Sequence, residues 1–439
     1  MYNANDTIYA LATVRGRAGV AVVRVSGEKV RQVCDIICPR KTLPPRKMVN
    51  ACLYDKDGEI IDNSLTVFFE SPHSFTGEDV VEFHVHGSLA IIKKLYRCLG
   101  EIKGVRLAER GEFSRRAVMN CKMDLTEAEG LLDLINAETE FQRKIALRQY
   151  SGEQRKIFDG WHDDIVKALA YMEAYLDFPE EEIDGNVEET IQSLIIRLSA
   201  SISEMLEKSS KGEAIRNGYQ IAILGKPNSG KSSLLNAIMK RDVAIVSDIE
   251  GTTRDVIEAY IDMDGYPVIF LDTAGIREAN DVIEAEGVKR ALAAADKADL
   301  ILLLTAADDK GGIVLPGNED DDRIIKVTTK ADLLSENTDV TGLKISVKMD
   351  GTIEKLKKII VEKISHDLFS LNDSLLTHER HRQCLKSCLE NLFRARNNSV
   401  LPLKAEDIRL AARDLAQITG AITTDDLLDV IFGDFCIGK

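Results

Sequence analysis

The sequence predicts a multidomain fold in which an α+β domain is followed by a helical domain that an α/β domain interrupts. Three observations predict it. The 439 residues exceed what one ordinary core organises. Hydrophobic residues change along the chain from alternation to helical spacing, and then to strands alternating with helices. Helical patterns also stand on both sides of the alternating region. The predicted domains are 1–120, 121–216, 217–374 and 375–439, and the second and fourth together form the helical domain.

Composition and charge narrow the class of protein. The chain is 44% hydrophobic and 29% charged, as globular proteins are. Its net charge of −15 argues against a general nucleic-acid coat but leaves room for one local basic patch. The most apolar stretch, "ADLILLLTAA", is too short to span a membrane and fits a buried strand. The first residues lack the order of a secretory signal, and eight scattered cysteines are typical of a cytoplasmic protein.

The N-terminal domain is predicted from short runs of alternating apolar and polar residues. These runs are "TIYALATV", "GVAVVRVSG", "SLTVFFES" and "DVVEFHVHG", and Gly, Pro and Asn break the chain between them. The segment 88–102 then changes to helical spacing. Strands with a helix of this kind indicate an α+β domain.

The helical domain is predicted from two stretches with apolar residues at helical spacing. One begins at "LTEAEGLLDLI" and the other covers 191–210. Thr126 followed by Glu129 predicts a capping box at the first helix. Residues after about 370 are helical again, so we expect them to pack with the earlier helices.

The region 217–374 alternates strands with helices. Strand patterns such as "YQIAILG", "YPVIFLDTAG" and "DLILLLTAA" are separated by helical ones such as "SSLLNAIM" and "GTIEKLKKIIVEKI". This alternation predicts a parallel sheet with helices on both faces.

A phosphate-binding loop is predicted at "GKPNSGKSS" (225–233), which fits G-x-x-x-x-G-K-S. The glycines allow backbone N–H groups to turn toward phosphates, and the following helix adds a partial positive charge. Lys231 is expected to reach the β- and γ-phosphates, and Ser232 to bind Mg²⁺. A chance glycine turn is the alternative, but the preceding strand and following helix favour phosphate binding.

Four further segments follow in the order expected of a GTP hydrolase. "GTTRD" (251–255) predicts a first switch with a threonine hydroxyl on Mg²⁺. "DTAG" (272–275) predicts a second switch that senses the γ-phosphate. "TKAD" (329–332) supplies a carboxylate that accepts from both guanine N1–H and N2–H, and "SVK" (346–348) a loop over the base. Alone, "TKAD" would be interpreted as a helix cap. The predicted GTP-binding residues are Asn228, Ser229, Gly230, Lys231, Ser232, Ser233, Ser247, Thr252, Thr253, Asp272, Thr273, Ala274, Gly275, Thr329, Lys330, Asp332 and Ser346.

The second switch lacks one expected residue. Many GTPases place a glutamine after its glycine to orient the attacking water. Here that position is Ile276, whose side chain neither donates nor accepts a hydrogen bond. Another group must therefore position the water.

At this point the whole chain resembles the MnmE (TrmE) family of tRNA-modification GTPases. The resemblance rests on "NDTIYALAT", "GEDVVEFHVHG", "GEFSRRAVMNCKMDLTEAEGLLDLI", the phosphate loop, both switches and the terminal "FCIGK". It implies an N-terminal folate-binding domain that forms a homodimer, a central helical domain, and a Ras-like P-loop GTPase domain inserted into the latter. Thr329 departs from the asparagine that the family usually has there.

The resemblance also implies a reaction and its partners. With a flavin-dependent partner, MnmG (GidA), in a heterotetramer, the family modifies C5 of the wobble uridine U34 of tRNA. It adds an aminomethyl or carboxymethylaminomethyl group, and the carbon comes from a methylenetetrahydrofolate-type donor. GTP, Mg²⁺, K⁺ and a tetrahydrofolate derivative are the implied substrate and cofactors, and no membrane is involved.

The resemblance supplies a substitute for the missing glutamine. Facing G domains close when GTP and K⁺ bind, and the cation offsets developing negative charge. A glutamate downstream of the second switch, matching Glu284, orients the water. The Mg²⁺ ligands match Ser232 and Thr253. The K⁺ ligands match Asn228, Ser247, Ile249 and Thr252.

The folate contacts of the family match Arg24, Glu82, Lys122 and Lys439. Cations suit the glutamate tail of folate, and a carboxylate suits the donor edge of the pterin. Without the resemblance, Arg24 is a strand-surface charge and Glu82 a cross-strand partner. Cys436 matches a thiol that the modification needs. A buried tail cysteine is its alternative, and prenylation fits poorly because the last residue is lysine.

The pairs of cysteines have a simpler interpretation than a metal site. Cys34 with Cys38, and Cys384 with Cys388, are each four residues apart, but a zinc site needs four convergent ligands, so core packing is favoured. Two other functions also remain. One is a regulatory GTPase, for example in ribosome assembly, without modification chemistry. The other is a scaffold with an inactive GTPase.

Overall fold

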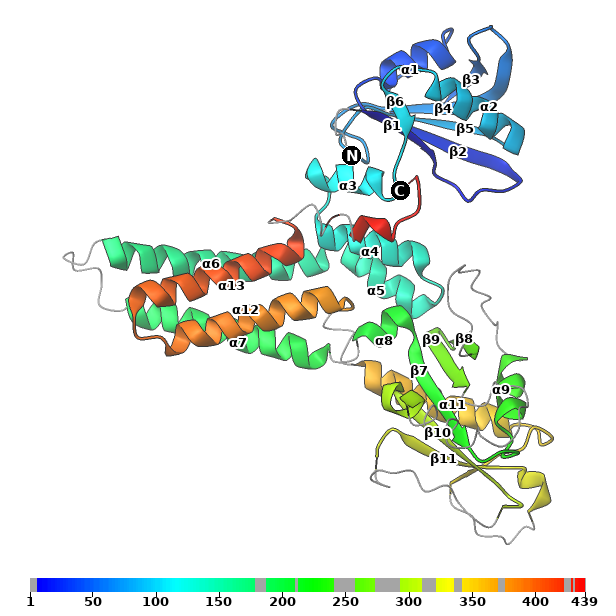
Figure 1. Ribbon diagram of the computed structural model, residues 1–439, viewed down its shortest axis with the longest axis vertical. Helices are drawn as coiled ribbons and strands as arrows, with labels where there is room; N and C mark the ends of the chain where they lie inside the picture. The colour runs from blue at the N-terminus through cyan, green and yellow to red at the C-terminus, as the bar shows by residue number, and fades with distance from the viewer. Residues whose placement is uncertain are drawn as a thin grey trace, which may run out of the picture. The chain divides into compact units, whose positions relative to one another are not determined.

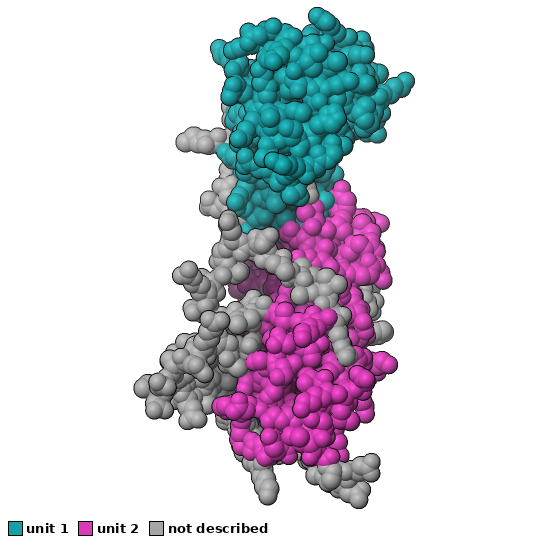
Figure 2. Space-filling model, turned by 90° about the vertical axis from the view of Figure 1, so that its right-hand side faces the viewer, with its two compact units in different colours: residues 1–132, 416–439 teal, residues 133–415 magenta. Residues whose placement is uncertain are grey.

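The computed structural model forms two compact units, residues 1–132 with 416–439, and residues 133–415 (Figure 2). It describes residues 6–177, 187–209, 212–240, 257–272, 293–309, 321–334, 342–369, 376–421, 428 and 431–438. Each unit has its own hydrophobic core. No helix in these ranges is both long and apolar enough to cross a membrane.

The first unit contains a six-stranded sheet in the order β3-β4-β5-β2-β1-β6 (Figure 1). Neighbouring strands are antiparallel except β1 and β6, which are parallel. Its elements are β1 Thr7–Leu11, β2 Ala18–Ser26, α1 Val30–Ile37, β3 Val49–Tyr54, β4 Ile60–Phe69, β5 Val80–Gly87, α2 Leu89–Gly100, β6 Val105–Leu107, α3 Glu112–Met119 and the greater part of α4 Leu125–Asn136.

The two faces of this sheet differ because side chains alternate along each strand. Val23 of β2 and Phe83 of β5 point into a core that α1 and α2 complete with residues such as Val33 and Leu95. Arg24 and Glu82, one position along each strand, therefore lie on the opposite face. Polar residues are only half-buried there, so this face leaves side chains within reach of a ligand.

The cap of α4 differs from the prediction. Asp124, rather than Thr126, accepts from the backbone N–H of Glu127 at 2.7 Å, and the Glu127 carboxylate accepts from the N–H of Asp124 at 2.7 Å. The box therefore begins two residues earlier than the expected pair Thr126 and Glu129. Thr126 donates its hydroxyl proton to Asp124 instead.

The C-terminal segment packs within the first unit. Phe432 and Phe435 join Ala117, Met123 and Leu125 in one apolar cluster. The tail then forms a β-bridge between Ile437 and Arg110. Cys436 and Ile437 thus lie against the start of α3 and the loop before it.

The helical part of the second unit contains segments from before and after the α/β region. Its elements are α5 Glu140–Tyr150, α6 Glu153–Asp177, α7 Val187–Lys208, α8 Gly212–Asn217, α12 Glu379–Asn397 and α13 Leu401–Thr419, which extends past the unit's end. Helix α7 packs against both α6 and α12. Trp161 of α6 donates to Ser201 of α7 at 3.2 Å, and Gln192 of α7 donates to the carbonyl of Arg396 in α12. The predicted insertion of an α/β domain into a helical one is confirmed.

The α/β part forms a six-stranded sheet in the order β12-β11-β10-β7-β9-β8 (Figure 1). All neighbours are parallel except β8, which pairs antiparallel with β9 at the edge. Its elements are β7 Tyr219–Gly225, α9 Lys231–Met239, β8 Ile257–Met263, β9 Tyr266–Asp272, β10 Leu300–Ala306, β11 Ile324–Thr329, the 3₁₀ turn Ala331–Leu333, β12 Leu343–Lys344 and α11 Thr352–Phe369.

Helices cover both faces of this sheet, as predicted. Ile221 and Ile223 of β7 pack in one cluster with residues of α9 and α11. Ala222 and Leu224, which point the other way, pack with Ala295 and Ala298. A central strand buried on both faces explains why "YQIAILG" is nearly all apolar.

Candidate nucleotide-binding site

The phosphate loop connects β7 to α9 at the carboxyl edge of the sheet, where ligands bind in α/β folds. Asn228 has a φ of +63° and Gly230 a φ of +91°, so the loop turns sharply before α9 begins at Lys231. The Lys231 ammonium donates to the carbonyls of Gly225 at 2.7 Å and Lys226 at 2.9 Å. The Lys231 ammonium is therefore held by backbone carbonyls of the loop itself.

Close packing makes one glycine of the loop necessary. A Cβ at position 225 would lie 2.3 Å from the Ser229 hydroxyl and 2.9 Å from the carbonyl of Leu304. The Ser229 hydroxyl is buried and has no hydrogen-bond partner among the described residues. An unpaired buried polar group is uncommon, and its presence in this loop fits a site that a polar ligand completes.

The segment "TKAD" (329–332), which is predicted to recognise guanine, is hydrogen-bonded directly to the phosphate loop. The Thr329 hydroxyl donates to the backbone carbonyl of Ser229 at 2.7 Å, across 100 residues of sequence. Thr329 is buried where β11 ends. The residue that departs from the family pattern thus joins the two predicted parts of the site.

The Asp332 carboxylate is fixed by the loop that was predicted to lie over the base. The Ser346 hydroxyl donates to its Oδ1 at 2.6 Å, and Lys348 Nζ lies 3.4 Å from its Oδ2. The hydrogen bond from Ser346 is the main cause that holds the pKa of Asp332 below its ordinary value. The carboxylate is therefore ionised at neutral pH, as an acceptor for two guanine N–H groups must be.

Neighbouring lysines are anchored at the end of β10. Lys330 has a φ of +55°, and its ammonium lies 3.0 Å from Asp308. Lys226 of the phosphate loop lies 3.0 Å from Asp309. Both carboxylates follow the end of β10. The neighbouring strands β11, β10 and β7 therefore all contribute residues to the carboxyl edge of the sheet.

The structure places only part of the predicted set. The backbone of Asp272 is level with that of Ile223 in the β9–β7 ladder, next to the phosphate loop. The remaining predicted positions Ser247, Ile249, Thr252, Thr253, Thr273, Ala274, Gly275, Ile276, Glu284 and Lys439 lie outside the described residues.

In the first unit, Arg24 and Glu82 face each other across β2 and β5. They are directly opposed in the register, and Arg24 Nε donates to Glu82 Oε1 at 2.8 Å. The guanidinium also lies over the rings of Phe75 and Phe113 at 5.3 and 5.7 Å. The two side chains are 19% and 15% exposed, so the ion pair is only partly screened by water.

Lys122 and Cys436 belong to the same unit. The N–H of Lys122 donates to the carbonyl of Ala117, and its side chain lies over Gly77. Cys436 is exposed, so the alternative of a buried tail cysteine is wrong. Its carbonyl accepts from the N–H of Gly111 at the start of α3.

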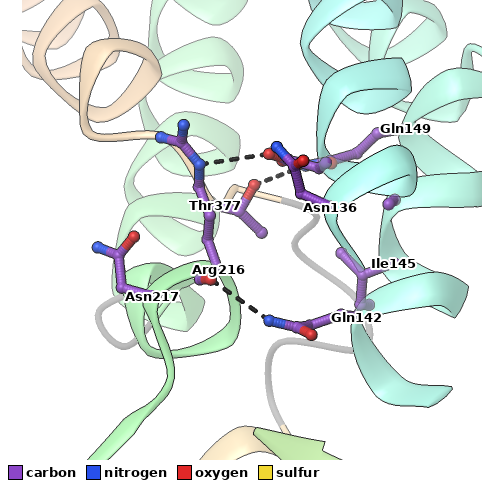
Figure 3. A pocket seen from close by; sticks show the side chains of 9 residues that line it. Asn136, Gln142, Ile145, Gln149, Arg216, Asn217 and Thr377 are labelled. Carbon is purple, nitrogen blue, oxygen red and sulfur yellow. Dashed lines mark hydrogen bonds and ion pairs between the residues drawn. The ribbon is translucent and has the colours of Figure 1, made fainter. Parts of the chain in front are cut away.

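A polar cavity of about 150 Å³ lies where the chain enters and leaves the α/β part (Figure 3). Arg216, just before β7, lies 3.2 Å from the Asp133 carboxylate, and His378, just after the return, lies 2.8 Å from it. One carboxylate therefore holds both connections. Gln149 donates to Thr377, and both residues line the cavity.

Helix α5 contacts the β8–β9 hairpin. Gln142, which completes the α5 capping box with Thr139, donates to the carbonyl of Arg216 and to the Tyr260 hydroxyl at 3.1 Å. Burial raises the pKa of Tyr260 to about 12, so this hydroxyl is neutral at physiological pH. Phe141 donates its N–H to Gly265 at the hairpin turn. The hairpin lies in sequence between the two predicted switches, so this contact joins the switch region to the helical part.

Among the described residues no three His, Cys, Asp or Glu side chains gather as a metal site. Cys38 and Cys388 are buried instead, each four residues after a partly exposed cysteine, and the Cys38 thiol donates to the carbonyl of Cys34. The core packing that the four-residue spacing of these cysteines favoured is therefore what the structure shows for Cys38 and Cys388.

Comparison with known proteins decides the family. A model described as the MnmE helical domain matches residues 125–436, and one for the GTP-binding protein TrmE N-terminus matches residues 7–122. The chain belongs to the MnmE family. Proteins called tRNA modification GTPase MnmE from Rickettsia bellii (strain RML369-C) and Parvibaculum lavamentivorans are each 44% identical over 99% of this chain and all of their own. The MnmE of Ehrlichia chaffeensis is 43% identical over the same shares.

Proposed function

We propose that this chain is a GTPase that acts in tRNA modification, and that it modifies C5 of the wobble uridine U34 with a flavin-dependent partner of the MnmG type. The added group is aminomethyl or carboxymethylaminomethyl, with its carbon from a methylenetetrahydrofolate-type donor. Membership of the MnmE family supports the reaction. The observation that carries the nucleotide site is the hydrogen bond from Thr329 to the phosphate loop, because it joins phosphate binding to guanine recognition.

The roles of the described residues follow from their chemistry. Backbone N–H groups of the phosphate loop and the Lys231 ammonium bind the phosphates. The Asp332 carboxylate accepts from guanine N1–H and N2–H, a pair of donors that adenine does not present in that arrangement. Ser346 keeps this carboxylate oriented, because its hydroxyl donates to Oδ1.

The exposed side chains of Asn228 and Ser232 offer the oxygen ligands that Mg²⁺ and K⁺ prefer. Ser232 with Thr253 holds Mg²⁺, and Asn228 with Ser247, Ile249 and Thr252 holds K⁺. Bound at the phosphates, these ions supply positive charge against the negative charge that develops during hydrolysis.

Glu284 takes the place of the glutamine that Ile276 replaces, and orients the attacking water. Glu284→Ala is expected to leave GTP binding nearly intact and to slow hydrolysis. A comparable loss of GTP affinity, measured with a fluorescent analogue, would refute that role.

The Arg24–Glu82 pair fits a folate site. Glu82 offers a carboxylate to the pterin, and Arg24, Lys122 and Lys439 offer cations to the glutamate tail. His84 Nε2 is buried without a hydrogen-bond partner among the described residues and lies 3.5 Å from Glu82 Oε2. A polar ligand on this face would satisfy it. Cys436 supplies the thiol of the modification reaction.

The partners proposed with this function are a second copy of the chain, bound through the N-terminal domain, and an MnmG-type flavoprotein in a heterotetramer. The protein then works in the cytoplasm on tRNA. Its predicted domain boundaries at 120, 216 and 374 belong to the same proposal.

Nucleoside mass analysis of tRNA from a deletion strain tests the function. We expect U34 to lose its modification, and plasmid copies of the wild type, but not of Lys231→Ala or Cys436→Ser, to restore it. Unchanged U34 in the deletion strain would contradict the proposal and favour the regulatory GTPase without modification chemistry.

A further inference from the structure

The first unit carries a dense run of positive charge that the proposed function does not use. The segment "PRKTLPPRK" (39–47), here called the basic loop, has four cations and no acid in a chain whose net charge is −15. The cations are Arg40, Lys41, Arg46 and Lys47. Since the chain as a whole repels polyanions, a local concentration of this kind is where an anionic partner can approach.

The four cations are exposed and none forms an ion pair with a carboxylate of the described residues. Several other cations of the unit are paired with carboxylates. Lys94 lies 2.6 Å from Asp55, and Arg106 lies 2.7 Å from Glu112. The charge of the four basic-loop cations is therefore not neutralised by carboxylates among the described residues, whereas that of Lys94 and Arg106 is.

Hydrogen bonds hold the second half of the basic loop, residues 44–47, against the sheet. The N–H of Arg46 donates to the carbonyl of Phe68 at 2.7 Å, and its guanidinium donates to the carbonyl of His73 at 2.8 Å. The N–H of Lys47 donates to Pro44, closing a turn in which two prolines fix the backbone. An anion that binds here pays little conformational entropy.

The two ends of the basic loop lie near opposite ends of β3, the edge strand of the sheet. Arg40 lies over the ring of Tyr54 at the end of β3, at 5.3 Å, and Lys47 leads to Val49 at its start. Six residues of strand span roughly 17 Å. The cations therefore form a row rather than a point, which matches the repeated charges of a polynucleotide backbone better than one small anion.

We propose that the basic loop binds the phosphate backbone of tRNA and so positions the substrate of the proposed modification. This inference rests on the proposed function. The four side chains offer phosphate contacts without base recognition, so they fix how the RNA lies and carry no sequence preference.

Lys41→Glu combined with Lys47→Glu tests the proposal. The side chains of these lysines make no contact that the fold requires among the described residues. Binding of total tRNA to the full chain is measured by filter retention across a range of KCl. We expect affinity to fall at least roughly tenfold at 0.1 M salt, and the slope of log K against log salt to become shallower by about two.

The matched control is Lys93→Glu with Lys103→Glu, two exposed lysines of the same unit that change the net charge equally. We expect it to bind tRNA within roughly twofold of the wild type. Circular dichroism and GTP hydrolysis without tRNA should be unchanged in both variants.

Three results would overturn the inference. If the wild type binds tRNA and both variants bind equally well or equally poorly, the basic loop is not the contact, although the proposed function stands. If the wild type does not bind tRNA, the tRNA function fails as well. If the loop variant loses binding only to phosphatidylglycerol vesicles, the loop faces a lipid surface instead.

Discussion

The two candidate sites, one in the α/β part and one in the first unit, are assembled in different ways. In the α/β part, each contributing segment is a short continuous run after a strand, such as the phosphate loop after β7 and "TKAD" after β11. In the first unit, Arg24 and Glu82 come from strands 58 residues apart and meet only because β2 pairs with β5 in one register.

This difference decides how each site tolerates change. A loop at a strand end keeps its backbone geometry when a side chain is replaced, so a substitution removes one ligand contact. A half-buried ion pair on a sheet face leaves an unpaired charge when either partner is lost, so a substitution there also costs stability. Variants of the strand-end loops should therefore weaken nucleotide binding, whereas variants of the Arg24–Glu82 pair should also lower the free energy of unfolding.

The largest effect is expected for Asp332→Asn. It removes a charged acceptor for two guanine donors and leaves one of them facing an amide N–H, so GTP affinity should fall roughly 100- to 1,000-fold. Affinity for xanthosine triphosphate should rise. Because the pKa of Asp332 is held below its ordinary value, its carboxylate is ionised at neutral and mildly acidic pH, and its contact with guanine is lost only as the pH falls through this lowered pKa. Isothermal calorimetry with both nucleotides measures this, and equal losses for both would contradict guanine recognition.

Lys231→Ala should weaken GTP binding roughly 10- to 100-fold, since one charge-assisted contact with the phosphates is lost. Thermal unfolding of the nucleotide-free protein should hardly change. Lys240→Ala, an exposed lysine at the end of the same helix, is the control and should bind GTP normally. A similar loss in both variants would mean that net charge, rather than the loop, determines affinity.

The pair in the first unit should show the opposite pattern. Arg24→Gln and Glu82→Gln should each destabilise the unit by about 1–3 kcal/mol, between the values for surface and buried pairs. The double variant should cost less than the sum. Urea unfolding of the four proteins measures the coupling, and binding of a stable tetrahydrofolate derivative measures the site. GTP affinity should not change. If the two losses of unfolding free energy are strictly additive, Arg24 and Glu82 do not interact.

A smaller effect is expected where the α/β part meets α5. Gln142→Ala removes hydrogen bonds to Arg216 and Tyr260, at a cost of about 1–2 kcal/mol. GTP affinity should be nearly unchanged, because Arg216 and Tyr260, the two partners that lose their hydrogen bonds, lie outside the phosphate loop. Gln383→Ala, on an exposed face of α12, is the control for thermal unfolding. If both variants unfold at the wild-type temperature, the contact contributes nothing to stability.

The sequence was sufficient for features that depend on neighbouring residues. The phosphate loop, the order of strands and helices in the α/β part, and both covered faces of its sheet were predicted. The contact of Thr329 with Ser229 was not, because it depends on how β7, β10 and β11 align across 100 residues. The Arg24–Glu82 ion pair depends in the same way on the register of β2 and β5.

Two local errors have physical reasons. Asp124 with Glu127 and Thr126 with Glu129 have the same spacing and suitable residue types, so the sequence alone does not choose between them. The helix begins after the turn at Cys121, which has a φ of +55°, and this start makes Asp124 the capping residue. The β8–β9 hairpin was missed, although Asp264 and Gly265 form the two-residue turn, both with positive φ, that the pair Asp-Gly favours.

GTP turnover per chain, measured in K⁺ and in Na⁺ over a range of protein concentrations, tests the central claim most directly. That claim is that this chain hydrolyses GTP without the usual glutamine, with an alkali cation and a second G domain in its place. We expect turnover to be fast in K⁺, to increase with protein concentration, and to stay low in Na⁺. Equal turnover in the two salts, independent of concentration, would contradict the account.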